Sequence, residues 1–298
     1  MAGADGAAEP AGATGDIVVP PASTVSSTET EVILAAGDIA ECTTDSGDEA
    51  TAEILGQHPE ATILTLGDNA YPEGRAEAFA KCYDPTWGKY KDRTRPATGN
   101  HDFGVKDAAA YADYFGEAGG PFDQYYYSYD LGAWHVVVLN SDCWRAGGCG
   151  LADPQVQWLY SDLTRHPARC TLAYFHRPPF SSGRYGDPAA TDRVRPIWEV
   201  LYEGGADVVL TGHEHSYERF VPMNSRGESE AGGLQLFVVG TGGGNLRKYD
   251  NPPLPTTAIR QDHAWGVLEI TLRPDGYDWE FLPVKDANFH DSGSGTCR

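Results

Sequence analysis

Long hydrophobic runs are absent from this chain of 298 residues. The longest apolar stretches, such as Trp134 to Leu139 with a histidine inside, fall far short of the ~20 residues that cross a bilayer as a helix. We therefore expect no membrane span. Hydrophobic residues still make up 41% of the chain, which is enough to bury a sizeable core, and one α/β domain of this length is ordinary.

The first 30 residues lack the features of a secretory signal. Residues 1–30 are rich in Ala, Gly, Pro, Ser and Thr, and they have neither a positively charged start nor the apolar stretch that such a signal needs. This composition is typical of a flexible spacer. We predict a disordered segment over residues 1–30 and one folded domain over residues 31–298.

Positive charge is scarce in this sequence. The chain has 22 Lys and Arg against 43 Asp and Glu, which gives a formal net charge of −21 at pH 7. Nucleic-acid polymers and anionic membranes need a basic face, so both are excluded as bulk partners. A small phosphate ester is not excluded, because 16 of the 22 basic residues are Arg, whose guanidinium binds phosphate oxygens through paired donors.

The six cysteines include no Cys-x-x-Cys pair, so a zinc knuckle or a thioredoxin-type site has no support. We expect disulfides instead. Cys143 and Cys149 enclose a short glycine-rich loop, and the remaining four can pair in several ways. Disulfides indicate an exported protein, secreted or in the cell envelope, whose signal peptide is not part of this sequence. The alternative is a cytosolic enzyme with six reduced, mostly buried thiols.

Runs of aliphatic and aromatic residues alternate with helical patterns, which predicts an α/β fold with a mostly buried sheet. One helix is indicated by Asp153 and Pro154 at its start, and another, near Val194 to Tyr202, ends at Gly204. The predicted strands are Glu31 to Ala36, Ala61 to Leu66, Trp134 to Leu139, Thr171 to Phe175, Asp207 to Thr211, Leu234 to Val239 and Val267 to Leu272, with Thr94 to Thr98 as a further candidate.

Polar residues follow several of these strands directly. Open α/β folds bind ligands outside the carboxyl ends of their strands, so polar side chains at these positions are candidates for a site. Singly, each has a structural explanation, because Gly-Asp and Asn-His-Asp sequences are common in turns. The candidates are Asp38, Asp68, Tyr71, Asn100, His101, Asp102, His176, His213 and His215. Together they offer the carboxylate, amide and imidazole donors that suit Fe, Mn and Zn.

His213 and His215 carry the strongest single signal. In an extended segment, alternate side chains point to the same side, so both imidazoles face one place. Burying two neutral imidazoles together requires a partner for each of them. Metal binding explains the pair better than two separately satisfied core histidines.

Five short blocks occur in the order GDIA, GDNAY, GNHD, AYFH and GHEH, beginning at Gly37, Gly67, Gly99, Ala173 and Gly212. This set resembles the signature of calcineurin-like metallophosphoesterases, and GDNAY with GHEHSYER is similar to the purple acid phosphatase branch. The resemblance covers roughly residues 32–244. It implies a four-layer α/β/β/α sandwich of two mixed sheets flanked by helices, with the catalytic domain over residues 31–298.

Carried over residue by residue, the resemblance implies two metal ions bridged by Asp68. Fe(III) would be held by Asp38, Asp68, Tyr71 and His215, and a divalent Fe, Zn or Mn by Asp68, Asn100, His176 and His213. The chemistry of Tyr71 agrees with this assignment. A phenol with a pKa near ~10 needs a strongly polarising cation to lose its proton at neutral pH, and a trivalent ion polarises most.

The reaction that the resemblance implies is hydrolysis of a phosphomonoester by a metal-held hydroxide that attacks phosphorus. His101, next to the implied ligand Asn100, is placed to donate a proton to the leaving alkoxide. Asp102 is expected to raise the pKa of His101 as a neighbouring anion. Simple support of the ligand loop is the alternative role for His101.

The sequence departs from the family after His176. Plant and animal purple acid phosphatases place a histidine there to contact substrate, but Phe180 to Gly186 contains none. Arg184 and Tyr185 are candidates to replace it, with Arg184 binding a phosphate oxygen; two ordinary exposed side chains are the alternative. Asp102 stands where many purple acid phosphatases have Glu. An acidic pH optimum is therefore not assumed.

Two other segments lie beside these blocks. The glycine-rich loop from Thr241 to Asn245 lacks the Lys and the spacing of a phosphate-binding P-loop, which favours access to the metal cleft over nucleotide binding. Glu218 and Arg219 follow the last histidines, where they either hold the ligand loop or form a surface ion pair.

Two other functions remain open at this point. One is a phosphodiesterase acting on nucleotide or glycerophosphodiester substrates. The other is an exported metal- or phosphate-binding module without activity, which is disfavoured because all seven expected ligand positions are filled. The expected partner is a small phosphate ester in either enzyme, and the sequence predicts no oligomeric state.

Overall fold

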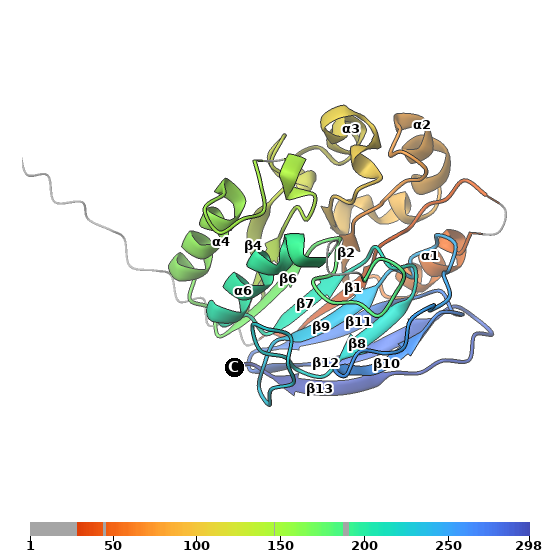
Figure 1. Cartoon of the computed structure of the whole chain (residues 1–298). Helices are drawn as coiled ribbons and strands as arrows, with labels where there is room; N and C mark the ends of the chain where they lie inside the picture. The colour runs from red at the N-terminus through yellow and green to blue at the C-terminus, as the bar shows by residue number, and fades with distance from the viewer. Residues whose placement is uncertain (1–28, 44–45, 146, 187–190) are drawn as a thin grey trace, which may run out of the picture.

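The computed structural model describes residues 29–43, 46–145, 147–186 and 191–298. They form two mixed β-sheets that lie face to face, with helices on the outer sides (Figure 1). The expected α/β/β/α sandwich is confirmed. The spacer predicted over residues 1–30 falls almost wholly outside the described residues and stays a prediction.

The first sheet has six strands in the order β13-β12-β11-β1-β2-β3. Strands β1, β2 and β3 are parallel, and β11, β12 and β13 continue the sheet in antiparallel pairs. The bounds are Glu31–Ala36 for β1, Thr62–Leu66 for β2, Thr94–Ala97 for β3, Gly266–Arg273 for β11, Gly276–Pro283 for β12 and Ser292–Thr296 for β13.

The second sheet has seven strands in the order β10-β8-β9-β7-β6-β5-β4. Strands β5, β6, β7 and β9 are parallel, and β4, β8 and β10 pair antiparallel at the two sides. The bounds are Tyr127–Leu131 for β4, Trp134–Val138 for β5, Cys170–Tyr174 for β6, Val208–Thr211 for β7, Tyr217–Phe220 for β8, Gln235–Val239 for β9 and Thr257–Gln261 for β10.

Helices α4 and α6 pack against the second sheet (Figure 1). Helix α4 begins at Pro154 directly after Asp153, and α6 ends at Glu203 before Gly204, so both predicted helices are confirmed. On the opposite side, α1 contacts β11 of the first sheet. The α-helices of the described residues are α1 Asp48–Gln57, α2 Ala76–Ala78, α3 Ala109–Phe115, α4 Pro154–Arg165 and α6 Arg195–Glu203.

The parallel strands of the second sheet are buried on both faces. In β5, Val136 and Val138 belong to the core between the sheets, whereas Val137 belongs to the core under α4 and α6. A strand that is covered on both faces reads as a continuous apolar run rather than as an alternating one. This is why the central strands were visible in the sequence.

All seven predicted apolar runs are strands, with ends that agree to within one residue. Strands β4, β8, β10, β12 and β13 were not predicted. The clearest case is β13, whose sequence SGSGT has no apolar pattern. Its strand conformation depends on antiparallel pairing with β12, and such long-range pairing is not encoded in local propensity.

Three disulfides join all six cysteines, in the pairs Cys42–Cys82, Cys143–Cys149 and Cys170–Cys297. The expectation of disulfides is confirmed, and the pairing that the sequence left open is resolved. Cys170 lies in β6 and Cys297 directly follows β13, so the third disulfide joins the two sheets. Disulfides of this kind are typical of proteins in oxidising compartments.

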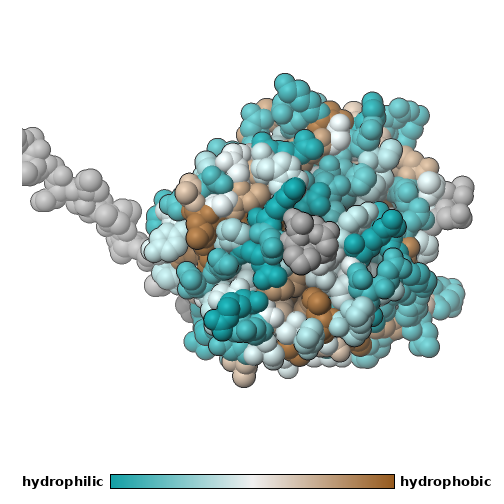
Figure 2. Space-filling model, viewed as in Figure 1, coloured by the Kyte–Doolittle hydropathy of each residue, from teal (hydrophilic) through white to brown (hydrophobic). Residues whose placement is uncertain are grey.

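The surface agrees with the acidic composition. The face in Figure 2 is mainly hydrophilic, and its apolar residues form small separated groups. No helix among the described residues combines the length and the apolar character that crossing a bilayer requires.

The disulfides should differ in their contribution to stability. Cys170–Cys297 closes a loop of 127 residues and Cys143–Cys149 a loop of 6. Chain entropy predicts a loss in unfolding free energy of about 5 kcal/mol for the double variant Cys170→Ser/Cys297→Ser and about 2 kcal/mol for Cys143→Ser/Cys149→Ser. Guanidinium denaturation of both variants measures the difference. Equal losses in the two variants would contradict the loop-entropy explanation.

The pairing of all six cysteines has its own test. Wild-type protein that is denatured without reduction should show no free thiol in a thiol titration.

Candidate metal centre

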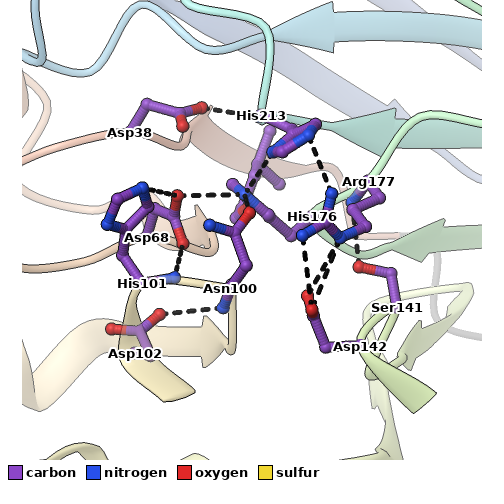
Figure 3. A network of polar contacts seen from close by, with 12 residues as sticks. Asp38, Asp68, Asn100, His101, Asp102, Ser141, Asp142, His176, Arg177 and His213 are labelled. Atoms are coloured by element: carbon purple, nitrogen blue, oxygen red, sulfur yellow. Dashed lines mark hydrogen bonds and ion pairs between the residues drawn. The ribbon is translucent and has the colours of Figure 1, made fainter. Parts of the chain in front are cut away.

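The predicted site residues lie on loops that leave the carboxyl ends of five strands. Strands β1, β2 and β3 are neighbours in the first sheet, and β6 and β7 are neighbours in the second. The loops of both sheets converge, as Figure 3 shows for Asp38, Asp68, Asn100, His176 and His213. The site is therefore built where the two sheets meet, and neither sheet alone contains it.

Three of these residues have left-handed backbone conformations. The φ angles are 59° at Asp38, 53° at Asp68 and 70° at His213, and each residue follows a glycine. Residues other than glycine seldom adopt this region, and such conformations cluster at functional sites because the surrounding structure must hold them. The turn aims each side chain into the site instead of along its strand.

The donor atoms of the first predicted set converge on the hydroxyl of Tyr71. This oxygen lies 2.8 Å from Asp38 Oδ1, 3.1 Å from Asp68 Oδ2 and 3.0 Å from His215 Nε2. Ligands that each lie ~2.1 Å from one ion are themselves about 3 Å apart. The four side chains thus have the spacing of donors around a single cation.

The second predicted set converges on Nε2 of His176. This nitrogen lies 3.1 Å from Asp68 Oδ2, 3.2 Å from Asn100 Oδ1 and 3.1 Å from His213 Nδ1. The same Asp68 oxygen therefore belongs to both sets. The structure brings together all seven side chains predicted as ligands, and it gives Asp68 the shared position.

Two of the histidines are oriented by backbone carbonyls. His176 Nδ1 lies 2.9 Å from the carbonyl oxygen of Leu66, and His215 Nδ1 lies 2.8 Å from that of Asn245. A carbonyl oxygen only accepts hydrogen bonds, so each Nδ1 carries the proton. The lone pair of each Nε2 then faces the carboxylates, which is the orientation that a metal ligand needs.

The buried ionisable groups of the site compensate one another's charge. Burial alone would raise the pKa of Asp68, but His176 and neighbouring histidines bring it well below its ordinary value. Burial would lower the pKa of His176, but Asp68 and Asp38 raise it to about 9. Burial, His176 and Arg177 keep the pKa of His213 well below its ordinary value. The buried carboxylate of Asp68 thus depends on positive charge beside it.

Tyr71 shows the same requirement most clearly. Burial, together with the carboxylates of Asp38 and Asp68, raises the pKa of its hydroxyl well above 10. A phenol in this position stays neutral unless a cation lies beside it. The donor set of two carboxylates, one phenol, one amide and three imidazoles fits two transition-metal ions.

His101 lies at the edge of the site. Its side chain is 34% exposed, and Nε2 is 3.9 Å from Asp68 Oδ2. Its Nδ1 donates a hydrogen bond to the carbonyl oxygen of Pro72, and its ring lies 4.5 Å from the ring of Tyr71. Nε2 is therefore the ring nitrogen that the Pro72 carbonyl leaves free, and His101 lines the pocket.

Asp102 has a different environment from the one we expected. Its carboxylate is fully buried and accepts hydrogen bonds from Gly99 N at 2.8 Å, Asn69 N at 3.2 Å and Asn69 Nδ2 at 3.0 Å. Burial and the nearby Asp68 raise its pKa to about 7. Among the described residues, no contact joins Asp102 to the ring of His101. Asp102 holds the loop that carries Asn100.

The site opens into a pocket of about 190 Å³, lined by Asp68, Asn100, His101, Arg177, Tyr185, His213, His215 and Arg247. Tyr185 is thus at the pocket, with its ring 4.8 Å from that of His213, whereas Arg184 is exposed and does not line it. Sequence reasoning missed Arg177 and Arg247. The one available signal was the position of Arg177 directly after His176.

Two neighbouring segments support the ligand loops. Gly244 N donates to the Asp38 carbonyl at 2.7 Å, so the glycine-rich loop packs under the first ligand loop. Glu218 is buried and accepts hydrogen bonds from the backbone N–H and the hydroxyl of Ser182. Arg219 forms an ion pair with Asp291 at 2.7 Å. The two residues therefore have separate structural roles.

Comparison with known proteins agrees with the geometry. The sequence pattern of the family described as Calcineurin-like phosphoesterase matches residues 29–217. Purple acid phosphatase 18 of Arabidopsis thaliana is 29% identical over 164 residues, covering 52% of this chain and 36% of that protein. A nucleotide pyrophosphatase/phosphodiesterase of Hordeum vulgare is 23% identical over 280 residues, covering 77% of this chain and 70% of that protein.

Among solved structures, purple acid phosphatase PPD1 from yellow lupin seeds superposes with a TM-score of 0.73. Its sequence identity is 16%, and the match covers 90% of this chain and 54% of that one. At this identity the likeness shows the fold alone. The chain spans only about a third of the length of the first curated relatives that it matches, at 36% and 32%.

The role of Asp102 can be tested by Asp102→Asn. The new amide would place an N–H₂ group against donors that now share a buried carboxylate, so the free energy of unfolding should fall by about 1–3 kcal/mol. Asp107→Asn is the matched control, because Asp107 is an exposed carboxylate with a left-handed backbone that Asn tolerates. Urea denaturation compares the two. Control-like stability of Asp102→Asn with lost activity would instead support the catalytic role expected from the sequence.

Proposed function

Because the chain belongs to the calcineurin-like phosphoesterase family, we propose that it is a purple acid phosphatase-like phosphomonoesterase with a two-metal centre. One observation carries the proposal. Two sets of four donor atoms, each with neighbouring separations near 3 Å, share a single carboxylate oxygen of Asp68. A shared carboxylate between two such sets is the arrangement expected of a bridged metal pair.

We assign the two sets to the two metal ions as the resemblance implies. Asp38, Tyr71 and His215 would complete the first site, which suits Fe(III) because of the phenol. Asn100, His176 and His213 would complete the second, which suits divalent Fe, Zn or Mn. When bound, the metal ions supply Lewis-acid activation of water and neutralise the charge that develops on the phosphoryl group.

The protein's own contribution is orientation and proton transfer. Carbonyl oxygens of Leu66 and Asn245 hold two imidazoles in fixed tautomers, so ligand lone pairs face the site before substrate arrives. The carbonyl of Pro72 keeps one proton on His101 Nδ1. His101 Nε2 is then the atom that we assign to protonating the leaving oxygen.

We also propose that the enzyme works outside the cytosol. All six cysteines are paired, and the reducing cytosol does not maintain structural disulfides of this kind. The substrate would therefore be a small phosphate ester in an oxidising compartment.

Metal content and turnover test the function together. Protein purified without added metal should contain about two metal ions per chain, including iron, and show a broad visible charge-transfer band from Tyr71 to Fe(III). It should hydrolyse nitrophenyl phosphate, and His213→Ala or Asn100→Ala should lower kcat/KM by about a hundredfold or more. Tyr71→Phe should remove the colour. His290→Ala is the matched control, since this histidine is exposed.

Other outcomes identify the alternatives. A chain that binds two metal ions but turns over no phosphate ester would be the binding module. Faster turnover of bis-nitrophenyl phosphate than of nitrophenyl phosphate would favour the phosphodiesterase. Unchanged turnover in His213→Ala and Asn100→Ala would contradict the assigned ligands.

Removal of metal should also lower the stability of the folded protein. Chelation leaves the buried carboxylates of Asp38 and Asp68 with only histidines as counter-charges. Because a ligand that binds only the native state stabilises it, the melting temperature should fall on chelation and recover on adding metal. Differential scanning calorimetry with and without chelator measures this shift. An unchanged melting temperature in protein shown to have lost its metal would contradict the prediction.

A further inference from the structure

Two arginines face one pocket in a strongly acidic protein. Arg177 follows His176 after β6, and Arg247 follows the glycine-rich loop after β9. Both line the pocket above the predicted ligands, although the chain carries a net charge of −21. Two guanidinium groups beside a predicted site for metal ions would repel those ions and attract an anion into the same pocket.

Several contacts hold Arg177 in this pocket, and Figure 3 shows those with Asp142 and His213. Its Nε and Nη2 lie 3.3–3.4 Å from the carboxylate oxygens of the buried Asp142. Its Nη1 lies 2.9 Å from His213 Nε2, and its guanidinium carbon lies 5.3 Å from the ring centre of Trp144. Asp142 therefore acts as a positioning residue for Arg177.

The guanidinium of Arg177 has donors to spare. A guanidinium has five N–H groups. Asp142 takes the Nε–H and one Nη2–H, and His213 takes one Nη1–H. Two N–H groups, one on each Nη atom, have no acceptor among the described residues. Such a pair can bind two oxygens of one phosphoryl group.

Metal binding would release a third donor. His213 offers Nδ1 to the second predicted site. When Nδ1 is a ligand, the ring proton sits on Nε2, and an Nε2–H group cannot accept a hydrogen bond from Arg177. The Nη1–H that now points at His213 then needs another acceptor in the same pocket.

Arg247 approaches the pocket from another loop. Its backbone N–H donates to the carbonyl of His215 at 2.9 Å, and its guanidinium carbon lies 5.1 Å from the ring centre of Tyr185. No carboxylate of the described residues lies within ion-pairing distance of this guanidinium. An arginine without a carboxylate partner keeps its full positive charge available to a ligand.

We propose that Arg177 and Arg247 form an anion subsite for the terminal oxygens of a dianionic phosphoryl group, and that this subsite selects phosphomonoesters over phosphodiesters. The part of this proposal that concerns turnover rests on the proposed phosphoesterase function. The part that concerns anion binding rests on the pocket alone.

The selection follows from charge and oxygen count. A phosphomonoester has three terminal oxygens and, above its second pKa of ~6, close to two negative charges. A phosphodiester has two terminal oxygens and one charge. Two guanidiniums therefore gain more from the monoester, because each has an oxygen to bind and more charge to neutralise.

The test uses Arg177→Gln and Arg247→Gln with inorganic phosphate as the binding probe. Isothermal titration calorimetry on protein of measured metal content should show phosphate affinity lowered about tenfold or more in each variant, the loss expected when one charged hydrogen bond is removed. Arg226→Gln, at an exposed arginine paired with Glu228, should leave the affinity unchanged. Asp142→Asn should weaken binding less than Arg177→Gln does.

Turnover supplies the second readout. The ratio of kcat/KM on nitrophenyl phosphate to that on bis-nitrophenyl phosphate should fall about tenfold in both arginine variants. Unchanged affinity and ratio in both variants would overturn the subsite, as would a loss found in Arg184→Gln instead. If Arg177→Gln loses metal through its contact with His213, Arg247→Gln decides.

The two proposals fail separately. A wild-type protein that binds phosphate through these arginines but hydrolyses no ester would keep the subsite and overturn the enzyme. A protein that hydrolyses monoesters with no effect of either variant on phosphate affinity would keep the enzyme and overturn the subsite.

Discussion

The buried convergence of two carboxylates with a phenol and three imidazoles is the constraint on which the rest of the structure depends. Asp38 and Asp68 are almost completely buried, and isolated charges in such surroundings are strongly unfavourable. The surrounding histidines and the Tyr71 hydroxyl compensate them in the absence of a cation. The fold supplies an interior in which metal ions are the natural counter-charge.

That constraint explains why the site stands between two sheets. Each sheet contributes loops from the carboxyl ends of its parallel strands, and left-handed turns at Asp38, Asp68 and His213 direct the side chains inward. Strained turns persist only where the surroundings over-determine them. Such support comes from two places. The glycine-rich loop packs under Asp38, and the Asp102 carboxylate accepts hydrogen bonds from Gly99 and Asn69.

The same arrangement separates two kinds of positive charge. Inside the proposed metal site, the positive charge would come from bound metal ions, which can also take part in the chemistry. At the pocket wall it is fixed, because Asp142 and the Trp144 ring hold Arg177 in place. If the protein binds an anionic substrate as proposed, positive groups gathered in a recess would favour that binding, because electrostatic attraction is strong there.

Much of this molecule was determined by the sequence itself. Buried parallel strands read as apolar runs, and most of the candidate blocks follow such a run directly, so local patterns pointed to the polar residues from Asp38 to His215. Which of these residues would bind metal was an inference from the family resemblance. Local patterns do not contain contacts between distant segments. Only the tertiary structure decided that Arg247 shares a pocket with Arg177, that Asp102 bonds to Gly99 rather than to His101, and that SGSGT forms β13. The first depends on loops of distant segments meeting in one pocket, the second on the fold of the loop after β3, and the third on pairing with β12, and local sequence patterns specify none of them.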